Sequence, residues 1–255
     1  MEVTLQMYLI VLPLAFLAAT MDAIAGGGGV ISLPAYLTAG LPEVMASGSN
    51  KFSAMFGSLL ATFRFIKSGR MPYAPALLAA AGALPGSYLG AELLSHVNEA
   101  WLRGFFLIAL PAAALLLIFG RIGTGEPQPM TRKKLALCPA IGLAVGFYDG
   151  FFGPGTGTIL ILLFTWLLKM DVVSASGAAK MTNLASNVAA MVSLVNSGNV
   201  LFQLAVPAMV CSALGGYLGA KLALVVGVKL IRTVMVVVIG LILLRLVLQY
   251  FGAKI

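Results

Sequence analysis

The chain has 255 residues, of which 60% are hydrophobic and only 9% are charged, and its mean hydropathy is +1.03. A soluble domain carries about a quarter charged residues, so this composition excludes a sizeable domain that does chemistry in water and predicts a polytopic membrane protein. The formal net charge of +8 comes mostly from residues at segment ends, where cytoplasmic loops collect lysine and arginine, and does not indicate nucleic-acid binding. One histidine and two separated cysteines, Cys138 and Cys211, predict neither a metal site nor a cofactor.

Long apolar runs without period-two alternation predict transmembrane helices rather than a barrel. In chain order these segments cover 5–25, 30–41, 44–66, 72–94, 100–120, 135–152, 158–169, 173–195, 200–221 and 229–250. Two of them, 30–41 and 158–169, reach only about 18 Å, which is short of a hydrocarbon core of about 30 Å. We therefore expect an all-α polytopic membrane protein with eight full spans and two short broken or re-entrant helices.

The second half of the chain repeats the first. The stretch that begins at Lys51 matches the stretch that begins at Lys180, and the offset of 129 residues continues without a gap to Arg103 and Arg232. Duplicated halves with a short, glycine-interrupted segment at matching positions are typical of transporters. The repeat divides the chain into a first transmembrane repeat, a polar linker and a second transmembrane repeat, which cover 1–120, 121–134 and 135–255.

The placement of lysine and arginine indicates how the two halves are oriented. If the short segments carry the chain across the membrane, ten of these residues lie on one side and two on the other. If the short segments do not cross, the division is seven to five. Because positive charge collects on the cytoplasmic side, we expect two inverted repeats with both chain ends outside.

Each half carries a glycine-rich break just before its short segment. Such a break frees backbone N–H groups and lets a ligand approach closely, and the positive N-terminal end of the next helix points at it, which favours an anion. A tight turn, or close packing through small residues, is the alternative interpretation. The residues predicted to bind an anion here are Gly26, Gly27, Gly28, Gly29, Gly153, Gly155 and Thr156.

A lysine lies inside an apolar segment of each half, at positions 51 and 180. An ammonium group in the bilayer interior costs at least about 2.5–3.5 kcal/mol, so it should face a cavity or a partner. We predict that Lys51 and Lys180 supply positive charge to a bound oxyanion and that polar neighbours supply hydrogen-bond donors. For these neighbours, hydrogen bonds between helices are the alternative. The neighbours are Ser47, Asn50, Thr182, Asn183 and Asn187.

Two acidic residues, Asp22 and Asp149, precede the glycine breaks. Three roles are open to them. They can neutralise the lysines in buried pairs, they can exchange a proton because burial disfavours the charged carboxylate, or they can act as polar caps at the membrane interface. Pairing ranks first and proton coupling second.

These motifs resemble a known family. The run Asp22-Ala-Ile-Ala-Gly-Gly-Gly-Gly29 with Ser49-Asn-Lys51, and the run 146–155 with 179–183, are similar to those of the sulfite exporter TauE/SafE family of membrane permeases. The resemblance covers almost the whole chain and is to the bacterial inner-membrane proteins of that family. It implies a permease for sulfite, thiosulfate, organosulfonates or related small anions; a role for sulfur is implied by the resemblance alone.

The predicted function is secondary transport of a small anion, in which one repeat moves against the other about a site near the membrane midplane. A passive anion channel is the nearest alternative. An intramembrane enzyme would need a nucleophile–base or metal constellation, and a scaffold would not need a duplicated charged centre. The predicted partners are the anionic substrate and the lipid bilayer, with proton or sodium coupling and a homo-oligomer as further options.

Overall fold

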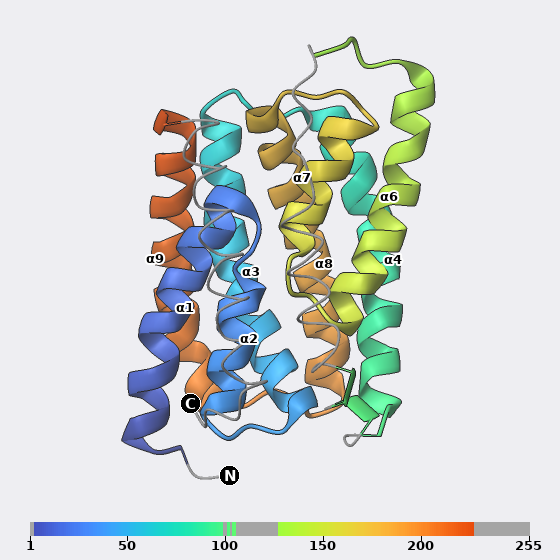
Figure 1. Ribbon diagram of the computed structural model, residues 1–255. Coiled ribbons are helices and arrows are strands. Elements are labelled where there is room, and N and C mark those ends of the chain that lie inside the picture. Colours follow the sequence, from blue (N-terminus) through green and yellow to red (C-terminus); the bar gives the residue numbers. More distant parts are fainter. Residues whose placement is uncertain (1–2, 99–100, 103, 106–126, 227–255) are drawn as a thin grey trace, which may run out of the picture.

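A computed structural model of the protein describes residues 3–98, 101–102, 104–105 and 127–226 (Figure 1). Within these ranges the regular structure is α-helical throughout, which confirms the predicted all-α class. The helices are α1 (Leu5–Ala25), α2 (Gly29–Thr38), α3 (Glu43–Lys67), α4 (Tyr73–His96), α6 (Arg132–Phe151), α7 (Thr156–Trp166), α8 (Val172–Asn196) and α9 (Phe202–Val226). The predicted span 229–250, nearly all of 100–120 and the start of the linker at 121–126 lie outside the described residues.

Several helix ends have a local cause in the sequence. Helix α6 begins after Thr131, whose hydroxyl accepts a bond from the backbone N–H of Lys134, and α8 begins after Asp171, whose carboxylate accepts from the N–H of Ser174 at 3.0 Å. Helix α1 ends at Gly26, where φ is +80°, a left-handed conformation that favours glycine. These signals are local, so the predicted segments match the helices closely.

The helices fall into three groups by length and polarity. By length and composition α1, α4, α6 and α9 are able to cross a membrane. Helices α3 and α8 have 25 residues each, enough for about 38 Å, but they carry the buried polar side chains of the protein's centre and are less apolar. Helices α2 and α7 have 10 and 11 residues and reach only about 15–17 Å, so neither can span a membrane alone.

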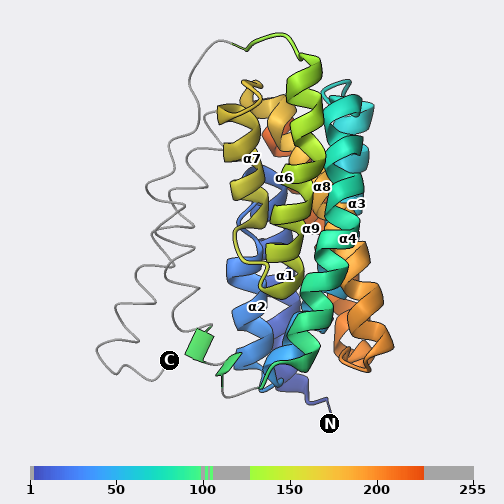
Figure 2. The same ribbon diagram turned by 90° about the vertical axis from the view of Figure 1, so that its right-hand side faces the viewer.

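The short helices belong to two hairpins that enter the bundle from opposite ends. In Figure 1, α1 rises from the lower end and α2 returns towards it, whereas α6 descends from the upper end and α7 returns upwards. Figure 2, turned by 90°, shows α7 above α2 on one face of the bundle. Helices α2 and α7 therefore both begin near mid-height and run away from each other.

Helices of the two halves are interlocked. Helix α4 of the first half packs along α6 of the second, and α1 of the first half packs along α9 of the second. Glycines make these contacts close: a Cβ added at Gly142 or Gly150 of α6 would lie 1.9 Å or 2.1 Å from a backbone oxygen of α4, and one at Gly215 of α9 would lie 2.3 Å from a backbone oxygen of α1. Small residues at four-residue spacing allow such backbone contact between membrane helices.

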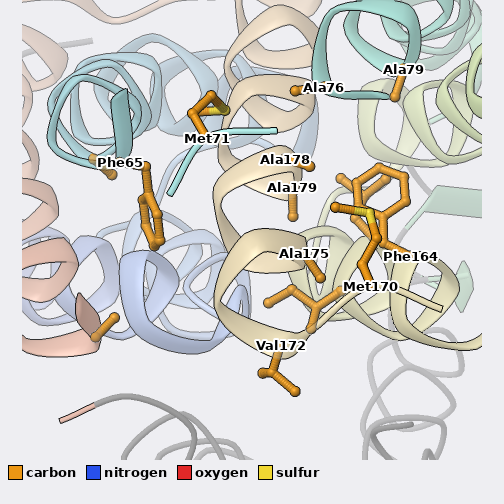
Figure 3. Close-up of a cluster of buried hydrophobic side chains, with 14 of the residues drawn as sticks. Phe65, Met71, Ala76, Ala79, Phe164, Met170, Val172, Ala175, Ala178 and Ala179 are labelled. Atoms are coloured by element: carbon orange, nitrogen blue, oxygen red, sulfur yellow. The ribbon is translucent and has the colours of Figure 1, made fainter. Parts of the chain in front are cut away.

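Two apolar clusters close the bundle above and below its middle. One includes Phe65 at the end of α3, Phe164 at the end of α7 and alanines at the start of α8 (Figure 3). The other includes Tyr36 of α2 and Leu194 at the end of α8. In α3 and in α8, most of the buried polar residues lie in the middle of the helix, between the residues that belong to the two clusters. The polar centre of the protein is therefore at mid-height.

Candidate functional site

The two glycine breaks meet in the middle of the bundle. A Cβ added at Gly26 would lie 2.2 Å from the backbone carbon of Gly157, at the start of α7. The N–H of Thr158 donates to the carbonyl oxygen of Gly26 at 3.2 Å, and its hydroxyl donates to that of Ala25 at 2.7 Å. The two glycine breaks, which are far apart in sequence, therefore touch at one place, which we call the crossing point. The contact requires glycine at both Gly26 and Gly157, because a Cβ on either residue would overlap the backbone of the other.

Two buried ion pairs surround the crossing point. Lys51 Nζ of α3 lies 2.7 Å from Asp149 Oδ1 of α6, and Lys180 Nζ of α8 lies 2.7 Å from Asp22 Oδ2 of α1. Each pair thus joins a lysine of one half to an aspartate of the other. Because removing one partner of a buried pair leaves an uncompensated charge, these pairs hold the halves in a defined relation.

The carboxylate of Asp149 is enclosed, and three donor groups surround it. Its Oδ1 accepts from Lys51 and from the hydroxyl of Thr156 at 2.7 Å, and its Oδ2 accepts a short bond from the hydroxyl of Ser186. The side chains of Lys51 and Asp149 are only 4% and 3% exposed. This pair is a closed network that ties α3, α6, α7 and α8 together.

The carboxylate of Asp22 is held more loosely. Its Oδ2 accepts from Lys180 at 2.7 Å and from the amide of Asn183 at 3.4 Å, and its Oδ1 accepts from the N–H of Gly28 at 3.4 Å. The side chain of Asp22 is 19% exposed, whereas that of Lys180 is fully buried. Lys180 also donates to the backbone carbonyl oxygen of Asp22, so its ammonium is held by two groups of the same residue.

A cavity opens beside these pairs and contains about 530 Å³ of space between atoms, its mouth included. The part of this space that the centres of water-sized molecules can reach is about 40 Å³, which is room for a few water molecules. Side chains and backbone of both halves line it. The predicted site residues among its lining are Asp22, Gly26, Gly28, Gly29, Asn50, Lys51, Asp149, Gly153, Thr156, Asn183 and Asn187.

The other predicted site residues do not line the cavity. They are Gly27, Ser47, Gly155, Lys180 and Thr182. Lys180 is covered and reaches the site through its contact with Asp22. The hydroxyl of Thr182 donates to a backbone oxygen one turn earlier in α8, at 2.9 Å, and Ser47 is buried within α3 at 2% exposure.

Several polar groups at the site escaped the sequence analysis. Ser32 and Ser212 line the cavity, and Ser186 completes the shell of Asp149. A single hydroxyl in an apolar helix is an ordinary feature of membrane proteins, so the sequence carries no strong signal for any of them. Asn50, which the sequence predicted, lines the cavity, and its buried Oδ1 accepts no hydrogen bond from the described residues; this oxygen can accept from water or from a protonated group but not from an oxyanion.

The charges at the site balance. With both lysines protonated and both aspartates ionised, the two pairs have no net formal charge. A positive field comes from the N-terminal ends of α2 and α7, because their first residues, Gly29 and Thr156, both line the cavity. Such a centre can accept an anion if one carboxylate is neutralised or moves away.

Interlocked apolar halves, a polar cavity at mid-height and two broken helices that begin there define a multi-pass membrane transporter with a small-molecule substrate. The chain belongs to the Sulfite exporter TauE/SafE family, whose family model matches residues 11–246. This confirms the resemblance found in the sequence motifs, and it places the chain among transporters rather than enzymes.

Several curated proteins are similar to this chain over nearly their whole length. A probable membrane transporter protein of Haemophilus influenzae is 33% identical over 237 residues, which are 93% of each chain. Probable membrane transporter protein ORF9 of a Sinorhizobium species is 36% identical over 88% of this chain and 86% of its own. Probable membrane transporter protein YfcA of Escherichia coli is 33% identical over 94% of this chain and 90% of its own. No solved structure matches the chain significantly.

Proposed function

We propose that this protein is a secondary transporter of small anions, with sulfur-containing oxyanions such as sulfite, thiosulfate and organosulfonates as its substrate class. The observation that carries the proposal is the cavity onto which two helix N-termini open and beside which two lysines are buried. Backbone N–H groups and ammonium groups are the donors that bind oxyanions. The family description adds sulfite as the first substrate to test.

The proposed transport cycle uses two inverted repeats, 1–120 and 135–255, in a bacterial inner membrane. The opposite entry of the α1–α2 and α6–α7 hairpins supports this orientation (Figure 1). We expect both chain ends to lie outside the cytoplasm, because ten of the counted lysines and arginines then face the cytoplasm. A reporter enzyme that is active only outside the cytoplasm should therefore be active when it is fused to either end. Reporters located in the cytoplasm at both ends would contradict the inverted arrangement and favour the one in which the short segments do not cross, because the chain ends then lie on the side with seven of the twelve lysines and arginines.

The direct test is a flux screen in proteoliposomes. Sulfite, thiosulfate, methanesulfonate and simple carboxylates are offered to the purified protein, and uptake is followed over a range of concentrations. A transporter gives saturable uptake and accelerated exchange when the same anion is present inside. Flux that rises in proportion to concentration would instead identify a passive channel, and no flux of any of these anions would refute anion transport.

A paired substitution tests where the anion binds. Lys180→Met combined with Asp22→Asn removes a buried cation together with its counter-ion, so no carboxylate is left unpaired. We expect the apparent KM of the double variant for the transported anion to be about tenfold or more above that of Asp22→Asn alone, which corresponds to the loss of a hydrogen bond to a charged group. Equal KM values in the folded double variant and in Asp22→Asn would place the anion elsewhere in the protein.

A further inference from the structure

The donors around Asp22 already form a site for an oxyanion. An ammonium group from Lys180, an amide N–H from Asn183 and a backbone N–H from Gly28 converge on one carboxylate. These are the donor types that bind sulfonate or carboxylate groups in proteins. An anion that binds these donors therefore has to replace the carboxylate of Asp22, which lines the cavity.

Asp22 differs in this respect from its counterpart in the second half. Asp149 receives three short bonds from Lys51, Thr156 and Ser186 and is 3% exposed. Asp22 receives one short side-chain bond and two at 3.4 Å, and it is 19% exposed. Both aspartates line the cavity, but the carboxylate of Asp22 is the more exposed of the two and is weakly enough bonded to leave its donors.

An ionised Asp22 would oppose anion binding. Two like charges within a few ångströms of each other repel strongly in a site of low polarity, and the donors cannot be shared fully between them. The other charged groups that line the cavity, Lys51 and Asp149, form an ion pair at 2.7 Å and neutralise each other. From α9 and α7, which pack on α1, the polar lining groups are the hydroxyls of Ser212 and Thr156, which are uncharged.

We propose that Asp22 takes up one proton from the water of the cavity when the anion binds, and that the anion then replaces its carboxylate against Lys180, Asn183 and Gly28. This inference rests on the proposed anion transport. The carboxylate and a hydronium ion become a carboxylic acid and water, and no bond to the substrate forms or breaks. Lys180 stays in place because it also donates to the backbone oxygen of Asp22.

The charge balance follows directly. Before binding, the two pairs sum to zero. One proton and one monovalent anion arrive together, so the loaded site also sums to zero, and the membrane midplane is crossed without net charge. The protein is then a symporter of one proton with one monovalent anion, and Asp22 is an internal competitor that keeps the site closed until the proton arrives.

The test measures binding of methanesulfonate to the full-length protein in lipid nanodiscs by titration calorimetry. Methanesulfonate keeps its single charge across the range in which a carboxylate titrates, so the pH dependence belongs to the protein. For the wild type we expect affinity to rise as pH falls, by up to about tenfold per pH unit, with uptake of about one proton per anion. Buffers with different ionisation enthalpies count that proton.

Asp22→Asn and Asp149→Asn form a matched pair of variants at equivalent positions of the two halves. We expect Asp22→Asn to bind methanesulfonate at neutral pH at least about tenfold more tightly than the wild type, with no pH dependence and no proton uptake. Asp149→Asn alone leaves Lys51 without its counter-ion, so it is combined with Lys51→Met, and this double variant should keep the pH dependence and the proton. Asp22→Ser serves as a second neutral replacement if Asp22→Asn does not fold.

Each result decides between the inference and the function on which it rests. If the wild type binds the anion without a proton, or depends on sodium instead, or if a neutral replacement of Asp22 keeps the pH dependence, the role of Asp22 is overturned while anion transport stands. If the wild type neither binds nor transports methanesulfonate, sulfite or thiosulfate, both fall. Infrared difference spectra give a readout without mutation, because anion binding should produce the carbonyl stretch of a protonated carboxylic acid.

Discussion

Lys51→Met lowers the free energy of unfolding by about 3–5 kcal/mol, because it leaves Asp149 ionised and buried without its cation. Methionine has a similar length and no charge, so the packing of α3 changes little. The two hydroxyl groups that also bond to Asp149 cannot replace a full charge. The measurement is the thermal or denaturant midpoint of the purified protein in detergent, followed by a probe of tertiary structure.

The control for Lys51→Met is a double variant that removes both charges of the buried pair. Asp149→Asn added to Lys51→Met removes both charges, and replacing a whole buried pair is often nearly neutral. We therefore expect the double variant to recover most of the roughly 3–5 kcal/mol that a single variant loses, so the two positions are strongly coupled. Equal destabilisation in the single and double variants would mean that this pair does not hold the halves together.

Gly26→Ala costs about 2–5 kcal/mol. Two penalties add: the left-handed backbone at φ +80° costs about 1–2 kcal/mol for a residue with a Cβ, and overpacking costs about 1–3 kcal/mol. The Cβ would lie 2.2 Å from the backbone of Gly157, and backbone cannot rotate out of the way. The yield of folded protein and its melting temperature measure the effect.

Gly40→Ala separates these two penalties. Gly40 also has a positive φ, +90°, but a Cβ there meets no atom within 4 Å. We expect this variant to lose only the backbone contribution of about 1–2 kcal/mol and to keep its transport activity. If Gly26→Ala is no worse than Gly40→Ala, the crossing of the two breaks tolerates more space than the contact with Gly157 indicates.

Both predictions concern the centre of the bundle. The closed pair and the contact between glycine breaks fix the two halves at the centre of the bundle, where the α1–α2 and α6–α7 hairpins meet (Figure 1). The open pair of Lys180 and Asp22 lies beside them, at the cavity. Stability and binding therefore depend on different ion pairs, which allows one to be changed without abolishing the other.

The sequence by itself determined the helices, their approximate ends and the duplicated motif. These follow from local chemistry: an apolar run long enough to span must be helical in lipid, and the left-handed glycine or a capping side chain ends or begins a helix where it stands. The predicted segment 5–25 coincides with α1, and 30–41 and 158–169 contain most of α2 and α7. The motif also sufficed to indicate the family, which the family model supports across residues 11–246.

The tertiary structure alone decided which groups meet. Sequence spacing could not reveal that Asp22 bonds to Lys180, 158 residues away, or that Gly26 contacts Gly157, because both contacts depend on how α1, α7 and α8 pack across the two halves. It also decided that the lysines are neutralised and that Lys180 is hidden whereas Asp22 is accessible. Exposure and charge balance are properties of the packed site, and no single segment of the chain carries them.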